Sequence, residues 1–305
     1  PKEIINRDYE FLARDELLSF EEIARVGRAA AQLGASKIRI TGGEPLLRRD
    51  IEDLIAMLAA IAGIDDVTLT TNGSLLARKA AGLAAAGLNR VTVSLDALDD
   101  AVFMAMNDAG FPVADVLAGI DAAADAGLSP VKVNMVVKRG VNDHEVVPMA
   151  RHFRDTGHIV RFIEYMDVGT TNGWRLDDVV PAAEIVDAIS ADCPVEPVPP
   201  RYPGEVARRF RYTDGSGEFG VITSVTRPFC GSCTRARLSA EGVLYTCLFS
   251  AAGHDLRPVL RSGAGDDAVH AALRAIWEQR DDRYSEIRSA ATADLPRVEM
   301  SYIGG

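Results

Sequence analysis

The stretch KIRITGGEP, residues 37–45, decides the fold. Its first five residues alternate charged or polar side chains with isoleucine, as a strand with one polar face does, and the two glycines and the proline then end the strand. A helix is predicted before it, from Ser19 to Gly34, because Ser19 and Glu22 form a capping box. Another helix is predicted after it, over residues 50–61. The local order is therefore helix, strand, helix.

The same alternation continues as far as Tyr165. Parallel strands are reached through helices, and such connections are right-handed. The predicted fold class is therefore α/β, with the strands forming a barrel or an open arc of one. After residue 166 the rhythm breaks, so two regions are predicted, residues 1–166 and 167–305. The further predicted elements are strands at 67–70, 90–96, 131–137 and 159–165, helices at 75–86, 113–126 and 143–154, and then short strands at 209–212 and 220–225, a helix at 267–279 and an extended tail at 292–305.

The charge of the chain limits its partners. Its 305 residues include 33 Lys and Arg against 44 Asp and Glu, a net charge of −11. An acidic protein does not hold nucleic acid or anionic lipid over a broad surface, so neither is an expected partner, and an anionic ligand needs a local group of cations. Four cysteines in a chain of this length do not form a disulfide framework. No apolar run reaches about 18 residues and no signal peptide is seen, so a cytoplasmic location is expected.

Each predicted strand carries polar residues where a strand covered on both faces should be apolar. This pattern indicates a sheet that curves around a ligand cavity. For Lys37, Arg90 and Arg161, a strand end that reaches solvent explains the charge equally well. The cavity explanation is favoured for residues in the middle of a strand between apolar neighbours, namely Arg39, Ser94, Lys132 and Asn134.

Parallel sheets bind ligands at the carboxyl ends of their strands. Three of these ends are rich in small and polar residues, at 41–45, 70–73 and 94–96. Gly42 and Gly43 leave the backbone open to a ligand, and Glu44 beside them can accept a hydrogen bond from an ammonium or a ribose hydroxyl. Each motif alone is a common turn, but together they indicate a ligand site.

Three cysteines lie close together in the last third of the chain. Cys230 and Cys233 form a C-x-x-C turn, and Cys247 follows fourteen residues later. Three thiolates without an obvious fourth indicate a 4Fe-4S cluster with one open iron. His254 leaves a Cys₃His zinc site open as an alternative, a site without metal is a further one, and a redox pair is disfavoured because no thioredoxin-like unit surrounds the turn.

Two arginines follow this turn, Arg235 and Arg237, and alternation along an extended segment puts them on the same side. Such a pair beside a metal suits a polyphosphate or a purine edge. The alternative is that both are solvated surface residues.

Taken together, these motifs resemble the GTP 3′,8-cyclase family of radical S-adenosylmethionine enzymes, which carry out the first step of molybdenum cofactor biosynthesis. The resemblance covers essentially the whole chain in order. The segments that carry it are 1–3, 37–48, 70–73, 94–96, 161–166, 230–238, Cys247 and the final Gly304-Gly305.

The resemblance implies an incomplete (β/α)₆ barrel of the TIM-like radical SAM type, whose mouth is covered by a C-terminal iron–sulfur region. It also implies roles for individual residues. Cys230, Cys233 and Cys247 would hold a substrate-binding 4Fe-4S cluster. S-adenosylmethionine (SAM) would contact Gly43, Ser94 and Met166, with Gly42, Glu44 and Asn72 as neighbours. GTP would contact Arg39, Thr70, Lys132, Arg235, Ala236 and Arg237, and the residues assigned to catalysis are Arg235, Arg237, Gly304 and Gly305.

By the same resemblance, a 5′-deoxyadenosyl radical from SAM would convert GTP to 3′,8-cyclo-7,8-dihydro-GTP. An electron donor such as a flavodoxin or ferredoxin, delivery of the product to cyclic pyranopterin monophosphate synthase, and a homodimer are expected. The family's C-x-x-x-C-x-x-C loop, which holds a second 4Fe-4S cluster, is not found in this sequence. We expect its cysteines on a segment preceding Pro1. The alternatives are a GTP-binding homologue without radical chemistry, and a non-radical barrel lyase with a structural zinc.

Overall fold

The structure is a computed structural model of the chain. It describes residues 15–107, 110–168, 173–202, 204–227, 230–288, 298 and 300–303. The predictions for residues 1–3, Gly304 and Gly305 fall outside these residues.

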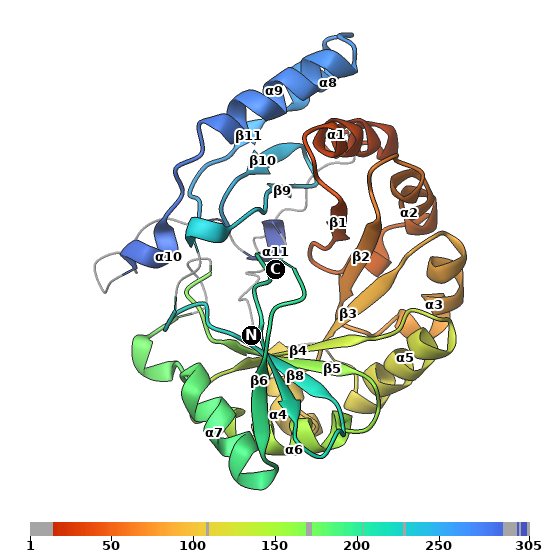
Figure 1. Cartoon of the computed structure of the whole chain (residues 1–305). Coiled ribbons are helices and arrows are strands. Elements are labelled where there is room, and N and C mark those ends of the chain that lie inside the picture. The colour runs from red at the N-terminus through yellow and green to blue at the C-terminus, as the bar shows by residue number, and fades with distance from the viewer. Residues whose placement is uncertain are drawn as a thin grey trace.

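The chain forms a curved, open sheet with helices on its outer side (Figure 1). Six parallel strands are adjacent in the order β1-β2-β3-β4-β5-β8, and β7 and β6 continue the sheet in antiparallel fashion. The described strands do not close into a barrel, which agrees with the expected incomplete barrel. Their bounds are β1 (Lys37–Ile40), β2 (Asp66–Thr71), β3 (Arg90–Ser94), β4 (Lys132–Val137), β5 (Ile159–Glu164), β6 (Val195–Val198), β7 (Arg208–Tyr212) and β8 (Glu218–Ile222).

The outer helices follow the predicted order closely. The capping box of α1 is present, with the Glu22 amide 3.2 Å from Ser19 Oγ and the Ser19 amide 2.9 Å from Glu22 Oε2. The helix expected at 143–154 divides into a 3₁₀ turn, η2, and α6, and neither α4 nor α7 was predicted. The bounds are α1 (Phe20–Gln32), α2 (Ile51–Ala59), α3 (Leu76–Ala85), α4 (Asp100–Asn107), α5 (Val113–Asp125), α6 (Val146–Phe153) and α7 (Ala182–Asp192), with 3₁₀ helices η1 (Pro45–Leu47), η2 (Asp143–Glu145), η3 (Leu176–Asp178) and η4 (Cys230–Ser232).

The main core lies between the sheet and these helices. The side chains of Leu69, Val93, Val133 and Phe162 are fully buried in it. Each belongs to the apolar face of its strand, and at about 25 cal/mol per Å² of apolar area this layer is the main source of stability for the parallel half. The sheet therefore turns its apolar face to the helices and leaves its other face for polar side chains.

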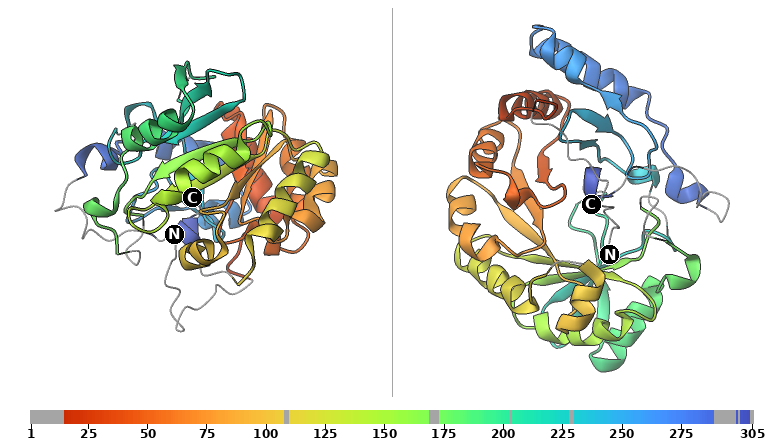
Figure 2. Two further views of the ribbon diagram at one scale, coloured as in Figure 1. Left: turned by 90° about the horizontal axis from the view of Figure 1, so that it is seen from below. Right: turned by 180° about the vertical axis from the view of Figure 1, so that it is seen from behind.

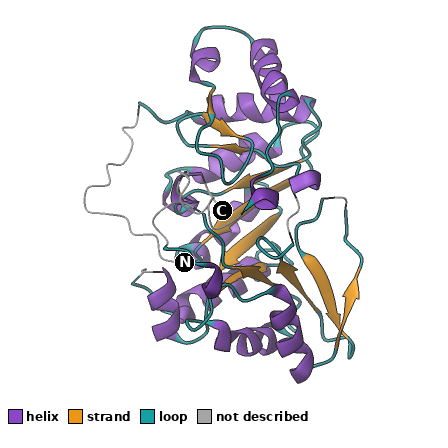
Figure 3. Cartoon of the chain, turned by 90° about the vertical axis from the view of Figure 1, so that its left-hand side faces the viewer, coloured by secondary structure: helices purple, strands orange, loops and turns teal. Residues whose placement is uncertain are grey.

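The C-terminal part forms a second layer that faces the open side of the arc. Its three-stranded antiparallel sheet lies between the large sheet and the pair α8–α9 (Figures 1 and 3). The views in Figure 2 show that α1 lies beside α8 and α9. The bounds are β9 (Arg237–Leu238), β10 (Val243–Tyr245), β11 (His254–Asp255), α8 (Arg257–Arg261), α9 (Asp266–Glu278), α10 (Tyr284–Ile287) and α11 (Met300–Ile303).

The prediction of an extended tail is wrong where the tail can be described. Residues 300–303 form the helical turn α11, in which Ile303 is buried and the Tyr302 hydroxyl donates a hydrogen bond to Glu241. Tertiary contacts of these two side chains set the local conformation, which the extended-looking composition did not reveal. None of the described helices combines the length and the apolar character that crossing a membrane requires.

Candidate functional site

The inner face of the sheet carries a continuous group of polar side chains. In the strand register Arg39 pairs with Thr68, Thr92 pairs with Lys132, and Asn134 pairs with Arg161. Residues paired across a sheet point to the same side, so strand after strand presents its polar residues together. The predicted polar face is thereby confirmed, and Arg161 belongs to it. We call the set Arg39, Thr70, Thr92, Ser94, Lys132, Asn134 and Arg161 the polar face.

Hydrogen bonds connect neighbouring strands across the polar face. Arg39 Nη1 lies 3.4 Å from Thr70 Oγ1, and Arg161 Nη2 lies 3.3 Å from Thr92 Oγ1. The buried Asn134 Oδ1 and Arg161 Nε have no hydrogen-bond partner in the part of the chain that the structure describes. A buried polar atom without a partner costs free energy, so such atoms are rare in folded proteins. Their presence on this face indicates a surface that binds a polar ligand.

Positive charge accumulates on this face. Burial, together with the charges of Arg161, Arg90, Lys37 and Arg39, lowers the pKa of Lys132 to about 7. Burial and the charge of Arg39 also lower the pKa of Arg161, although a guanidinium stays protonated at neutral pH. A group of cations that depress one another's pKa favours an anion with several charges, since such a ligand would offset their repulsion.

Arg39 on the polar face is exposed to solvent. Desolvation by the surrounding protein nevertheless lowers its pKa. Its guanidinium is therefore open to an approaching phosphate group.

Two arginines from the C-terminal part approach the same space. The charge of Arg235 lowers the pKa of Arg39, and after burial and Arg235, the charge of Arg39 contributes to lowering the pKa of Arg237. Both C-terminal arginines are half-buried while Ala236 between them is exposed, so the predicted alternation is confirmed. The positive charges of Arg39, Arg235 and Arg237, from positions almost 200 residues apart, therefore act on one another.

The three predicted metal ligands lie beside these arginines. Cys230 begins the turn η4, which the Cys233 amide closes by donating to the Cys230 carbonyl at 3.1 Å. Arg235 places Nε and Nη2 at 3.4 and 3.3 Å from Cys233 Sγ, and the Phe249 amide lies 3.4 Å from Cys247 Sγ. All three thiols are half-buried.

The surroundings of two of the thiols differ. Although burial alone would raise it, the pKa of Cys233 lies below the ordinary value because of the charge of Arg235 and hydrogen bonds from Arg235 and Arg280. Burial raises the pKa of Cys247, and the nearby Asp282 and Cys230 act in the same direction. Cys233 is therefore the thiol best prepared to act as a thiolate ligand.

The zinc alternative has no support in the described residues. Among them, no three His, Cys, Asp or Glu side chains gather closely enough to hold a single metal ion, and His254 is exposed on β11. A 4Fe-4S cluster spreads its thiolates over different irons, so its ligands need not converge on one point. The local group of half-buried thiols with arginines beside it fits such a cluster in donor chemistry, and the assignment of the three cysteines stays a prediction.

The loop after β1 is tied to the end of β2 by Glu44. Its carboxylate accepts hydrogen bonds from Thr71 Oγ1 at 2.8 Å and from the amides of Asn72 and Leu46 at 2.7 and 3.0 Å. These contacts hold the two strand ends together, and contact of Glu44 with a cofactor stays a prediction. Gly42 has φ +143°, and a Cβ on Gly43 would meet no atom within 4 Å, which leaves the backbone open.

The other predicted cofactor residues also lie at carboxyl ends of strands. Ser94 ends β3 and Met166 follows β5, both half-buried, while Asn72 Oδ1 accepts from Ser74 N at 3.0 Å and Ser74 Oγ at 2.7 Å. Contact of these residues with a cofactor stays a prediction. Sequence reasoning left Arg161 open between a strand end and the cavity, and only the strand register decides that it lies on the polar face.

Two family models match the chain, the Radical SAM superfamily over residues 5–153 and Molybdenum Cofactor Synthesis C over residues 158–286. The fold and the site thus define a radical SAM protein with a molybdenum cofactor synthesis C-terminal region. The GTP 3′,8-cyclase of Acidothermus cellulolyticus is 55% identical over all of this chain and 91% of its own length, and that of Staphylococcus aureus is 46% identical with the same coverage. The chain belongs to the GTP 3′,8-cyclase family, as its motifs predicted.

Among solved structures, methylornithine synthase (PylB) matches 61% of this chain and 55% of its own with a TM-score of 0.47 and 16% identity. This likeness is too loose to add to the family assignment.

Proposed function

We propose that this protein converts GTP to 3′,8-cyclo-7,8-dihydro-GTP, the first step of molybdenum cofactor biosynthesis. The observation that carries the proposal is the polar face, where the strand register brings Arg39, Lys132 and Arg161 to one side of the sheet. The charges of Arg235 and Arg237 in the C-terminal part add to this group, since Arg235 acts on Arg39 and Arg39 acts on Arg237. The whole protein has a net charge of −11, so a local group of positive side chains is unusual in it and is typical of an anion-binding site. Binding of a triphosphate is the purpose that the family name supports.

In this proposal the arginines and Lys132 bind the phosphates. Guanidinium groups suit phosphate oxygens because they offer paired, charge-assisted hydrogen bonds. Thr70 and Asn134 lie on the same face and offer hydrogen-bonding groups to the ribose. Holding both ends of the nucleotide limits its motion, so that the ribose and the base stay in the geometry needed for a new bond between them.

Cys230, Cys233 and Cys247 would hold the substrate-side 4Fe-4S cluster. Gly42, Gly43, Ser94 and Met166 would face SAM, with Glu44 and Asn72 shaping that end of the site. When bound, SAM and its cluster supply a radical that removes a hydrogen atom from the ribose. The chain's part is to exclude water and stray hydrogen donors and to orient the two reacting molecules.

The remaining expectations follow from the family. We infer that the protein acts in the cytoplasm, receives electrons from a flavodoxin or ferredoxin, and passes its product to cyclic pyranopterin monophosphate synthase. A homodimer and a second 4Fe-4S cluster on a C-x-x-x-C-x-x-C loop belong to the same proposal. The di-glycine end, Gly304-Gly305, would assist the radical step.

The test uses full-length protein reconstituted without oxygen and supplied with GTP, SAM and a reductant. The wild type should form both 5′-deoxyadenosine and cyclised GTP, and Arg235→Ala should lose cyclisation while 5′-deoxyadenosine remains measurable. Arg211→Ala serves as the control, because Arg211 pairs with Glu196 on the exposed edge of the sheet. GTP binding without 5′-deoxyadenosine in the wild type would favour the homologue without radical chemistry, and full cyclisation by Arg235→Ala would remove Arg235 from the site.

A further inference from the structure

A second buried group of polar side chains lies apart from the polar face. Asp167 and Arg288 form an ion pair, with Arg288 Nε 2.8 Å from Asp167 Oδ1. The exposed fraction of the side chain is 6% for Arg288 and 1% for Asp167. The Tyr284 hydroxyl donates to Asp167 Oδ2 at 2.7 Å. We call Asp167, Tyr284 and Arg288 the latch, because they join the end of β5 to helix α10, more than 100 residues later.

The latch touches both sides of the proposed site. Asp167 directly follows Met166, on the proposed cofactor side. On the other side the ring of Phe249 stacks on Tyr284 with centroids 4.7 Å apart, and the Arg288 guanidinium lies 4.9 Å from the centre of the Phe249 ring. The Phe249 amide in turn approaches the sulfur of Cys247. An unbroken series of contacts therefore runs from the neighbour of Met166 to a predicted cluster ligand.

A third segment is held from two directions. Arg288 Nη1 donates to the Ser224 carbonyl, while the buried Glu164 carboxylate accepts from the amides of Val225 and Thr226 at 2.8 and 2.9 Å. This loop leads from β8 toward Cys230. Glu164 and Arg288 therefore fix the approach to the cysteine turn against the end of β5, the strand that leads to Met166.

A buried ion pair is a poor device for stability, because its desolvation cost offsets much of its attraction. Its value is geometric, since each member of the pair is also held by a directed hydrogen bond, Asp167 by the Tyr284 hydroxyl and Arg288 by the Ser224 carbonyl. We propose that Tyr284, Arg288 and Asp167 are positioning residues that set the distance between the SAM side and the GTP side of the site. This inference rests on the proposed function and adds to it the group that aligns the two reactants.

The latch predicts a particular defect when it is disturbed. Displacement by about 1 Å can slow a positioned reaction by about a hundredfold. In Tyr284→Phe and Arg288→Lys, SAM should still be cleaved, but the radical should meet GTP less often. The amount of 5′-deoxyadenosine formed per cyclised GTP should therefore rise by about tenfold or more, with kcat for cyclisation falling more than KM for GTP rises.

The experiment measures this ratio in the reconstituted holoenzyme. Matched controls are Tyr212→Phe and Arg209→Lys, which alter a buried tyrosine and a partly buried ion pair on β7. Thermal unfolding of each variant shows whether it is folded, and Tyr284→Phe removes only one hydroxyl, so it keeps the test usable if Arg288→Lys unfolds. The controls should retain the wild-type ratio.

Two failures can be told apart. If the wild type forms no cyclised GTP, the proposed function is wrong and the latch inference falls with it. If the wild type cyclises GTP and folded latch variants keep the wild-type ratio, whatever their overall rate, then the latch is structural only and this inference alone is overturned.

Discussion

The parallel half of the molecule and its C-terminal part are stabilised in different ways. In the parallel half, the strands β1–β5 pack their apolar face against the outer helices in one large core. The smaller C-terminal core includes Leu256, Leu260, Val269 and Leu273, and it is completed by Leu18, Val26 and Ala29 from the region of α1. The large core also includes side chains of α7, β7 and β8, and among the described residues it takes none from β9–β11 or α8–α11, whereas the smaller core needs side chains from the region of α1.

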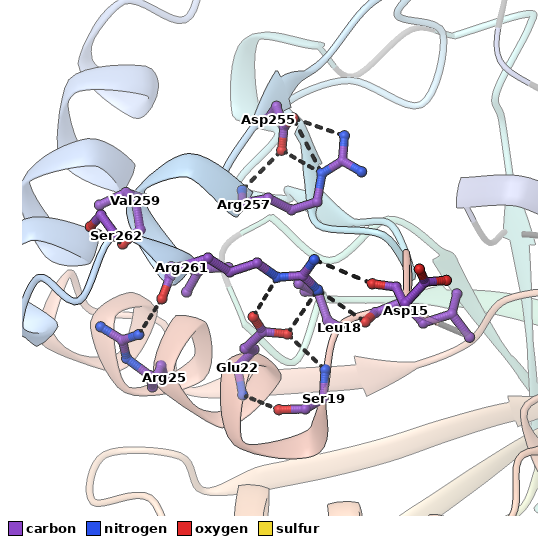
Figure 4. A network of polar contacts seen from close by, with 12 residues as sticks. Asp15, Leu18, Ser19, Glu22, Arg25, Asp255, Arg257, Val259, Arg261 and Ser262 are labelled. Atoms are coloured by element: carbon purple, nitrogen blue, oxygen red, sulfur yellow. Dashed lines mark hydrogen bonds and ion pairs between the residues drawn. The ribbon is translucent and has the colours of Figure 1, made fainter. Parts of the chain in front are cut away.

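Polar contacts strengthen this joint. Arg25 on α1 donates to the carbonyls of Leu260 and Ala264 at 2.8 Å each and pairs with Asp266. Figure 4 shows that Arg261 pairs with Glu22 beside it. Because the proposed GTP-binding residues come from both parts, the joint that docks the C-terminal part would also assemble the site. Residues of α1 therefore contribute both to stability and, by docking the C-terminal part, to the assembly of the proposed site.

The largest expected effect comes from the main core. Phe162→Ala removes a fully buried ring that contacts Phe219 edge-on at 6.0 Å, and it should lower the free energy of unfolding by about 3–5 kcal/mol. Urea unfolding followed by circular dichroism measures this loss. In hydrogen exchange, Phe162→Ala should raise the exchange of the whole sheet, and Leu273→Ala should raise it in α8 and α9 first. Equal effects of both variants on every strand would contradict the comparison.

A smaller effect is expected at the joint. Arg25→Ala removes two charge-assisted hydrogen bonds to carbonyl oxygens and an ion pair, which should weaken the docking of α8–α9 by about 2 kcal/mol. Hydrogen exchange of α9 against that of β3 measures the change. Arg274→Ala is the control, since Arg274 pairs only with Glu278 on the exposed side of the same helix. Unaltered α9 protection in Arg25→Ala would show that apolar contacts alone hold the joint.

The two parts should also differ in how pH affects GTP binding. Lys132 in the sheet has a pKa of about 7 without ligand, and a bound triphosphate would raise it. Binding above pH 7 must then take up a proton, so the affinity should fall by up to about tenfold per pH unit there. The arginines of the C-terminal part stay protonated and add no such dependence. Titration calorimetry in buffers of different ionisation enthalpy measures the uptake, and Lys132→Arg should abolish it.

The smallest effect is expected from acid. Hydrogen bonds from Arg25 and Arg28 hold the pKa of Asp266 below its ordinary value, and Arg261 does the same for Glu22. A lowered carboxyl pKa stabilises the fold above the ordinary value near pH 4, and the benefit disappears as pH falls through the lowered value. The difference in melting temperature between the wild type and Glu22→Gln should therefore shrink below about pH 4. A difference that persists at pH 3 would mean that charge is not its cause.

The sequence allowed the parallel half to be predicted well because its signals are local and periodic. The capping box at Ser19, the strand alternation around Arg39 and the sequence of helical crossovers each follow from neighbouring residues. The prediction of an extended tail failed at residues 300–303, because the hydrogen bond of Tyr302 to Glu241 and the burial of Ile303 decide the conformation there. A local sequence pattern predicts structure well where the same helix–strand unit is repeated around one core.

The candidate site could be predicted only in part for the same reason. Its polar strand residues follow from parity, and the Cys230–Cys233 turn follows from spacing. The effect of the Arg39 charge on Arg237, and the ion pair of Asp167 with Arg288, join residues more than 100 positions apart. No local pattern encodes such pairs. The three internal donors of Glu44 cannot be recognised from the sequence either, and its contact with a ligand stays a prediction.

The most direct test of the central claim is the dissociation constant of GTP for Arg39→Ala, Arg237→Ala and the control Arg211→Ala, measured on reconstituted protein without oxygen. If the two parts form one binding site, the first two variants should each bind GTP at least about tenfold more weakly, and the control should bind it like the wild type. Wild-type affinity in either Arg39→Ala or Arg237→Ala would show that one part binds the nucleotide without the other, and the account would be wrong.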